Sequence, residues 1–414
     1  MVVNAGNTGH VGGAGGAWAV AERYREFSWH RARGRSEAHE ELSARIGQDE
    51  EFCALLSGAL PAGEKQQPAL LLAAVRHLDG PHADLGPRGA AAYERWREWT
   101  VRHWDEVRAV IMRRTPRTDE PAHCAALLPL LATLPQPLAL LEAGTTAGLG
   151  LHPDRYRYRY AHAPFAHAPF ADGAKDGPGD GPEDEPGNGL GHGRAGPRTE
   201  AGAPESPAVF GCRTDWPAQE LAGRLPRIVW RAGITSDPLD PVSEPEDLRW
   251  LQALVWPGDG ERAARLSAAV EAVRTAPRPR MVRGDLVGDL PALAAEAPPE
   301  ATLVIFHSEA LGSLPPARRE EFARLVRSLL DGRPGGGHWI SHEPHAVLPW
   351  ITPPAHRSPH PDRPDARLTL ALDERPVALT GPHGRSLHRL PAPADTANTA
   401  NPANTANPAD APGT

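Results

Sequence analysis

The chain has 414 residues and a net charge of −8, a balance that excludes a non-specific electrostatic grip on nucleic acid or on an anionic membrane. Its three cysteines stand far apart, which argues against a zinc ribbon or a disulfide framework and is typical of a reducing cytosol. The N-terminus does not read as a signal peptide, and no run reaches the roughly 18 apolar residues of a membrane span, so we expect a cytoplasmic protein.

The first third of the chain has the pattern of an all-helical domain over residues 17–135. A Gly/Ala-rich segment, residues 1–16, precedes it, and we expect that segment to be disordered. Ser36 has the residue type and the position of a helix N-cap. A stripe of aromatic residues fits either a packing face or the wall of a ligand site, and it comprises Tyr93, Trp96, Trp99 and Trp104.

A buried strand and a glycine-spaced loop follow, in the sequence PLALLEAGTTAGLG of residues 137–150. The apolar run ends at Glu142, and the loop carries Gly144, Thr145 and Gly148. Glycines let a backbone approach a ligand closely, and the helix that we expect after the loop would present unpaired N–H groups. Every strand, turn and helix unit needs glycine, so the pattern fits a structural turn as well as a ligand loop.

Two acidic residues open the predicted helix, residues 119–134, that precedes this strand. Asp119 is predicted to be an N-cap acid, which suits the helix dipole. Glu120 is predicted to be a solvated acid of the first turn, and the alternative is that it points into the ligand site.

Low-complexity stretches interrupt the chain after the loop. Alternating Arg and Tyr over residues 155–160 predict a strand, and the alternative of a base-stacking patch is disfavoured by the acidic stretch nearby. Residues 171–207 are too rich in Gly and Pro to pack, so we expect a disordered insertion. The repetitive tail, residues 391–414, is also expected to be disordered. The repeated AHAPF of residues 161–170 could hold a metal weakly, but a solvated tract is the better interpretation and we predict no metal site.

Strands and helices alternate from residue 138 to residue 343, and two further strands then form a hairpin around Asp373 and Glu374. Such alternation requires parallel strands with right-handed crossovers. We therefore predict an α/β domain over residues 136–390, with a Rossmann-like, doubly wound, mostly parallel sheet and a C-terminal antiparallel hairpin.

Polar residues follow the ends of the predicted strands, where an open parallel sheet binds its ligands. Their succession after a Gly-rich first loop favours a nucleotide-like ligand. Together with the loop glycines Gly144 and Gly148, these residues are Glu142, Thr145, Thr235, Asp237, Asp285, His307, Ser308, Glu309, His342 and Glu343.

The order of these motifs resembles a known family. The resemblance is carried first by the helices YREF, HWDEVRAVIM and CAALLPLLA. It continues in the motifs LLEAGTTAGLGL, RIVWRAG, LVWP, RGDL, TLVIFHSEAL, HWISHEP and RPVALTGPHG. The chain is thereby similar to the actinobacterial domain-of-unknown-function family 2332. That resemblance covers residues 18–160 and 208–390. The second half also resembles class I S-adenosylmethionine-dependent methyltransferases, which implies a methyltransferase-like fold and S-adenosylmethionine as cofactor.

The methyltransferase resemblance implies a role for each strand end. The residues implied to surround the methionine part of the cofactor are Glu142, Gly144, Thr145 and Gly148. The acid that usually binds the ribose hydroxyls is replaced by Thr235, for which Asp237 could substitute. Asp285 would face the adenine amino group.

The resemblance also implies a catalytic set at the end of the fourth strand. His307, Ser308 and Glu309 stand where such enzymes position the substrate, and His307 or Glu309 could act as general base in an in-line methyl transfer. Either could equally be a structural cap or a salt-bridge partner. The substrate is expected to be a small molecule, and the oligomeric state is open.

These residues and motifs leave three candidate functions. The leading one is a methyltransferase that acts on a small molecule. The alternative is a non-catalytic binding or scaffold protein that keeps the fold without the cofactor, which Thr235 favours. An NAD-dependent enzyme is disfavoured because Glu142 precedes the glycines instead of following them by about 20 residues. Hydrolase, zincin and NTPase functions lack support because GxSxG, HExxH and GK[ST] motifs do not occur.

Overall fold

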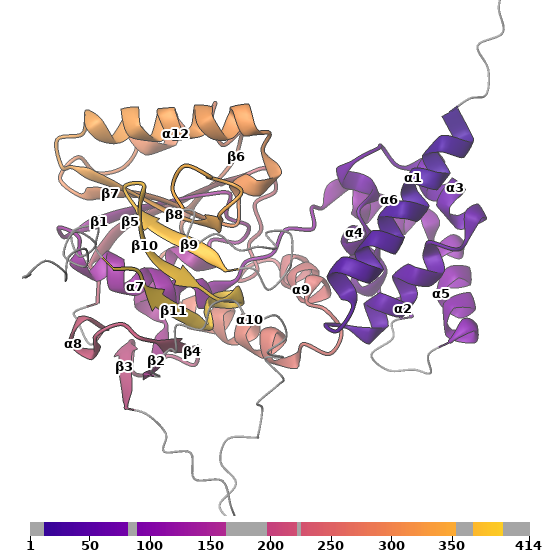
Figure 1. The fold of residues 1–414 in the computed structure, drawn as a ribbon, viewed down its shortest axis with the longest axis horizontal. Coiled ribbons are helices and arrows are strands. Elements are labelled where there is room, and N and C mark those ends of the chain that lie inside the picture. Colours follow the sequence, from indigo (N-terminus) through magenta and orange to yellow (C-terminus); the bar gives the residue numbers. More distant parts are fainter. Residues whose placement is uncertain (1–11, 82–88, 163–196, 222–224, 353–366, 392–414) are drawn as a thin grey trace, which may run out of the picture.

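The computed structural model describes residues 12–81, 89–162, 197–221, 225–352 and 367–391, and it contains a helical bundle beside an α/β unit (Figure 1). The bundle is formed by the N-terminal part of the chain, as predicted. Its helices are α1 (Gly12–Glu26), the π-helical η1 (Phe27–Ala32), α2 (Glu37–Ile46), α3 (Glu50–Ala59), α4 (Pro68–His77), α5 (Ala90–Arg102) and α6 (Trp104–Arg113).

Side-chain caps define where two of these helices begin. The Ser36 hydroxyl accepts the His39 N–H at the start of α2, which confirms the predicted cap, and Asp49 accepts the Phe52 N–H at the start of α3. The first helix begins at Gly12, within the segment expected to be disordered. In the part of the chain that the structure describes, no helix is long and apolar enough to cross a membrane.

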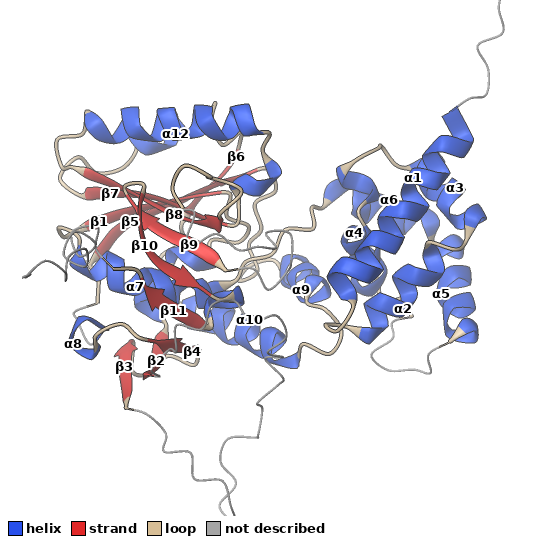
Figure 2. Cartoon of the chain, viewed as in Figure 1, coloured by secondary structure: helices blue, strands red, loops and turns tan. Residues whose placement is uncertain are grey.

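One large sheet forms the α/β unit (Figure 2). Its spatial order is β3-β2-β4-β11-β10-β9-β8-β7-β1-β5-β6. The strands are β1 (Leu138–Ala143), β2 (Arg157–His162), β3 (Arg198–Gly202), β4 (Val209–Thr214), β5 (Ile228–Thr235), β6 (Arg280–Arg283), β7 (Thr302–Ser308), β8 (Gly337–Pro344), β9 (Leu368–Leu372), β10 (Arg375–Thr380) and β11 (Ser386–Arg389).

The part of the sheet from β6 to β8 is parallel and doubly wound. From the central β1 the chain adds β5 and β6 on one side and then β7 and β8 on the other. The winding direction therefore reverses between β1 and β7, and ligands of such sheets bind at the carboxyl ends of the strands beside that point. The predicted doubly wound, mostly parallel sheet is present.

Helices cover both faces of this parallel part. Leu138 and Leu140 of β1 pack on one face and Ala139 and Leu141 on the other, because successive side chains of a strand alternate. Figure 1 shows α12 above the sheet and α7 and α10 below it. The helices are α7 (Cys124–Thr133), α8 (Ala218–Leu221), α9 (Pro245–Leu254), α10 (Gly260–Val273), α11 (Leu290–Ala295) and α12 (Pro316–Asp331).

The predicted helix after the β1 loop is absent from the described crossover. The chain instead makes two 3₁₀ turns, η4 (Leu149–Leu151) and η5 (Pro153–Arg155), and then forms β2, β3 and β4 at the far edge of the sheet. Gly148, Gly150 and Pro153 disfavour a helix here. Strand β3 lies inside the stretch expected to be a disordered insertion; residues 163–196 and 392–414 lie outside the described residues.

The C-terminal hairpin is present as predicted. Asp373 and Glu374 take left-handed φ angles of 49° and 63°, as a two-residue hairpin turn between β9 and β10 requires. A further strand, β11, pairs with β10 and joins the hairpin to β4. Its four residues were too few to predict from their pattern.

The helical bundle docks on α9 and on the segment that follows it, where two histidines of the bundle contact two tryptophans. His77 meets Trp250 edge-on with ring centroids 5.6 Å apart, and His39 meets Trp256 at 5.3 Å. Both nitrogens of the buried His39 ring have no hydrogen-bond partner among the described residues. Burial lowers the pKa of His39 from 6.5 to about 3 and also lowers the pKa of His77.

We expect this docking to weaken as the pH falls below 6.5. Below that value the unfolded chain protonates His39 and the folded chain does not, so the stability that neutral His39 contributes is complete above pH 6.5 and is lost as the pH falls toward 3. Substitution of His39→Phe keeps the aromatic contact and should reduce the pH slope of stability, by at most about 1.4 kcal/mol per pH unit.

Thermal denaturation between pH 7.5 and 4.5 measures this slope. The exposed His30 supplies the control, His30→Phe, which should keep the wild-type slope. Equal slopes for wild type and His39→Phe would contradict the assignment.

Candidate functional site

A short stretch between α6 and α7, residues 118–123, crosses the carboxyl ends of several strands; we call it the bridging segment. It ends in a 3₁₀ turn, η3 (Pro121–His123). Asp119 contacts the loop after β1, Glu120 contacts α10 and the β10–β11 connection, and His123 contacts β7 and β8. The segment therefore joins every part of the predicted ligand edge except β5 and β6.

The carboxylate of Asp119 accepts hydrogen bonds from the N–H groups of the glycine loop. It accepts the N–H of Thr146 at 2.8 Å, of Ala147 at 2.9 Å and of Leu149 at 3.0 Å. Burial raises the pKa of Asp119, and the three backbone N–H bonds oppose that rise. Asp119 is thus not the predicted N-cap, because α7 begins only at Cys124.

Glycine is required at two positions of this loop. Gly144 and Gly148 have left-handed φ angles of 83° and 69°. A Cβ on Gly144 would lie 2.4 Å from the Cβ of Ala310, so the loop packs directly against the chain that follows β7. Thr145, another expected cofactor residue, uses its hydroxyl to accept the Gly148 N–H at 3.0 Å.

Glu142 places a second acid beside Asp119. Burial, reinforced by the negative charge of Asp119, raises the pKa of Glu142 to about 8, although the Thr145 hydroxyl partly opposes the rise. Its Oε2 atom is buried without a hydrogen-bond partner among the described residues. A Cβ on Gly150 would lie 2.7 Å from Glu142 Oε1, so glycine makes room for this acid. The loop therefore holds two neighbouring acids, of which Glu142 keeps its proton at neutral pH.

The expected ribose and adenine positions have internal partners. The Thr235 hydroxyl accepts the Asp237 N–H at 3.4 Å, and Asp237 Oδ1 lies 3.4 Å from Arg283. Asp237 Oδ2 is buried without a partner among the described residues. Asp285 accepts the N–H of Gly288 at 2.7 Å, and this bond together with the Arg318 guanidinium lowers its pKa.

His307 lies on the opposite face of β7 from Ser308. It is fully buried on the α12 face of the sheet, where it contacts Phe322 and Trp339. Its Nδ1 lies 2.7 Å from Glu343, which also accepts the N–H groups of Ala310 and Leu311. His307 is thus packed in the core, and its role as a general base stays a prediction.

Ser308 and Glu309, in contrast, lie at the edge and contact the bridging segment. Ser308 Oγ lies 2.8 Å from His123 Nδ1 and 2.7 Å from His342 Nδ1, and His342 Nε2 lies 2.6 Å from the Thr380 hydroxyl. Glu309 Oε2 lies 3.7 Å from His123 Nε2. Two residues of this group were not predicted: His123 looks like an ordinary residue at a helix start, and Thr380 lies in a strand pattern that carries no chemical signal.

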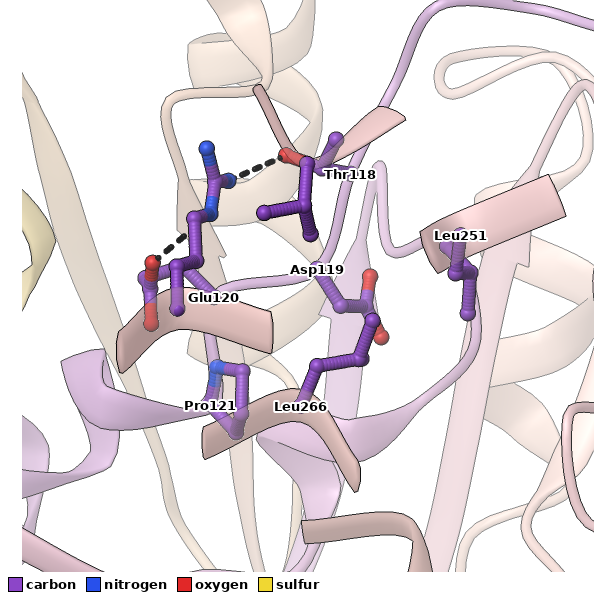
Figure 3. Close-up of a pocket in the computed structure, with 8 residues that line it drawn as sticks. Thr118, Asp119, Glu120, Pro121, Leu251 and Leu266 are labelled. Carbon is purple, nitrogen blue, oxygen red and sulfur yellow. Dashed lines mark hydrogen bonds and ion pairs between the residues drawn. The ribbon is translucent and has the colours of Figure 1, made fainter. Parts of the chain in front are cut away.

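The side chain of Glu120 is only 6% exposed, contrary to the prediction that it is solvated. Figure 3 shows its side chain and that of Asp119 diverging from the bridging segment. Burial alone would raise its pKa, but His383 at 3.1 Å and Arg262 at 3.3 Å lower the pKa to about 2. A small pocket of ≈ 270 Å³, its open mouth included, lies here, lined by Thr118, Asp119, Glu120, Pro121, Leu251, Val255, Arg262 and Leu266.

Comparison with known proteins assigns the chain to a family. The family described as "Uncharacterized protein conserved in bacteria (DUF2332)" matches residues 21–389, so the chain belongs to it. No curated protein and no solved structure matches the chain. Within the described ranges no three His, Cys, Asp or Glu side chains are grouped to hold a metal ion.

We expect Asp119→Ala to destabilise the protein by about 2–5 kcal/mol, because three loop N–H groups lose their partner. Asp119→Asn keeps one acceptor oxygen and should lose less. Urea denaturation measures both, and Asp331→Ala, which removes an exposed carboxylate at the end of α12, is the matched control. Wild-type stability in Asp119→Ala would contradict this account of the loop.

A second prediction concerns the pH dependence that Glu142 imposes. Above pH 4.5 the unfolded chain ionises this carboxyl, and the folded chain does so only near pH 8, so stability falls as the pH rises between these values. Glu142→Gln has no carboxyl group to ionise. As the pH rises, its free energy of unfolding should therefore increase relative to that of the wild type, by at most about 1.4 kcal/mol per pH unit. Denaturation at pH 5 to 8.5 tests this, with the exposed Glu205→Gln as control; parallel curves would refute it.

Proposed function

We propose that this member of the DUF2332 family binds S-adenosylmethionine, or a close relative of it, through the loop after β1 and methylates a small molecule. The observation that carries the proposal is the convergence of three loop N–H groups on one carboxylate at the reversal point of the sheet. Glu142 lies beside them with a free oxygen. The pair is complementary to the carboxylate and the ammonium of an amino acid, both of which the methionine part of the cofactor carries.

The Asp119 carboxylate lies where the carboxylate of the bound cofactor would lie. The three N–H groups that now bind Asp119 would hold the carboxylate of the cofactor, which requires the bridging segment to release them. Glu142 would then lose the neighbouring negative charge and gain an ammonium partner, and both changes favour its ionised form. This chain thus contributes a preformed anion cradle and an acid that ionises on binding.

The rest of the proposed site rests on Asp237. Its unpartnered Oδ2 offers an acceptor two residues beyond Thr235, where the usual acid is missing. Arg283 holds the other oxygen, which fixes the carboxylate. When bound, the cofactor supplies an electrophilic methyl group. Ser308 and Glu309 lie on the neighbouring strand end and could position the acceptor.

The second candidate is a non-catalytic binding or scaffold protein without the cofactor. The same Asp119 contact favours it, because the loop N–H groups already have partners. Asp285 likewise binds its own turn and Arg318. In this view Asp119 has a permanent structural role.

Titration calorimetry with S-adenosylhomocysteine and S-adenosylmethionine distinguishes the two candidates. We expect Asp119→Ala to bind either compound at least tenfold more tightly than the wild type, equivalent to about 1.4 kcal/mol, because the internal competitor is gone. Asp331→Ala should bind like the wild type. Absence of heat and of a thermal shift at millimolar ligand, in the wild type and in a folded Asp119→Ala, would overturn the cofactor proposal in favour of the scaffold.

A further inference from the structure

A second group of polar side chains meets at the ends of β7, β8 and β10, apart from the glycine loop. Its centre is Ser308, which is half-buried and lies within hydrogen-bond distance of two histidine rings. His123 and His342 are buried, and their rings meet edge-on with centroids 4.9 Å apart. A hydroxyl held between two imidazoles has a base on one side and a donor on the other.

The backbone of Glu309 explains why two consecutive residues contact the same histidine. Successive side chains of an extended strand point to opposite faces, so Ser308 and Glu309 would normally diverge. Glu309 has a left-handed φ of 50°, which is strained for a residue with a side chain. The turn brings its half-exposed carboxylate to 3.7 Å from His123 Nε2, while Ser308 binds Nδ1 of the same ring.

The direction of the hydrogen bonds follows from the carboxylate. Burial lowers the pKa of His123 and of His342, so each ring is neutral and carries one N–H. Glu309 favours the proton of His123 on Nε2, and Nδ1 then accepts the Ser308 hydroxyl. Ser308 Oγ in turn accepts the Nδ1–H of His342, whose Nε2 accepts the Thr380 hydroxyl at 2.6 Å. The protons thus point in one direction, from Thr380 through Ser308 to His123, whose Nε2 has no hydrogen-bond partner among the described residues and faces the Glu309 carboxylate at 3.7 Å.

We propose that Ser308 is an activated nucleophile that takes an acyl group from a small-molecule ester. His123 is its general base, Glu309 orients that base, and the His342 N–H stabilises the oxygen as its proton leaves. Nucleophile, base and orienting acid are recognised by geometry, so the missing GxSxG motif does not bear on the assignment: the base comes from a segment 185 residues earlier in the chain. The argument for this serine does not need S-adenosylmethionine to bind, although it gives Ser308 and Glu309 a different role from the acceptor-positioning one proposed above.

The reaction balances with water as the only co-reactant. Ser308 Oγ attacks the ester carbonyl carbon while His123 Nδ1 accepts the hydroxyl proton, and Glu309 stabilises the imidazolium. The bond from carbon to the leaving oxygen breaks, and the alcohol departs with the proton from His123. Water then attacks the acyl carbon while His123 Nδ1 accepts its proton; the bond from carbon to Ser308 Oγ breaks, His123 returns the proton to Oγ, and the carboxylic acid leaves.

The test uses the full chain and a fluorophosphonate, whose phosphorus traps an activated serine as the P–F bond breaks and fluoride leaves. We expect one adduct, mapped to Ser308 by peptide mass spectrometry, and none in Ser308→Ala. Labelling of His123→Asn should be at least tenfold slower, because asparagine cannot accept the proton. Ser313, five residues on, is more exposed and lies outside the cluster, so Ser313→Ala should label like the wild type.

Three results would overturn the proposal. They are a folded wild type without an adduct on Ser308, labelling of Ser313 at a comparable rate, and an unchanged rate in a folded His123→Asn. The first two come from the wild type alone, so they decide the matter even where a substitution prevents folding. Thermal denaturation of each variant identifies such cases.

Discussion

The bond between the Asp119 carboxylate and the loop after β1 is the constraint on which the rest of the site depends. A loop that leaves a central strand without entering a helix exposes backbone N–H groups in a buried place, and each needs a partner. Asp119 supplies that partner to three of them. Because this carboxylate is fixed at the centre of the sheet, the next residues are fixed too: Glu120 reaches α10 and His383, and His123 reaches Ser308.

This arrangement concentrates buried polar groups of opposite character at one edge. Burial, and then the neighbouring charge of Asp119, raise the pKa of Glu142 to about 8. The histidines stay neutral because burial opposes their charge. Groups of this kind are typical of functional sites, because titratable side chains are rarely kept buried and unpaired for stability alone.

Several elements could be predicted from the residues because their signals are local. The apolar runs of β1 and β7, the Ser36 cap and the Asp373–Glu374 turn each follow from neighbours along the chain. The prediction of a helix directly after the β1 loop was wrong. It followed from the alternation of strands and helices, but Gly148, Gly150 and Pro153 disfavour helix formation there. Asp119 was predicted to be a helix cap because an acid that precedes an apolar run usually is one. The residues around it do not show which N–H groups its carboxylate binds.

The alternation of elements, the loop with its two required glycines and the polar residues at strand ends all follow from the order of the residues. Which of these residues act together depends on how the strands and the bridging segment are arranged in space. His307 and Ser308 are neighbours in the sequence, yet one lies under α12 and the other at the carboxyl edge, because a strand alternates its faces. The partner of Ser308 stands 185 residues away, and only the pairing of β1 with β7 beneath the bridging segment brings the two together.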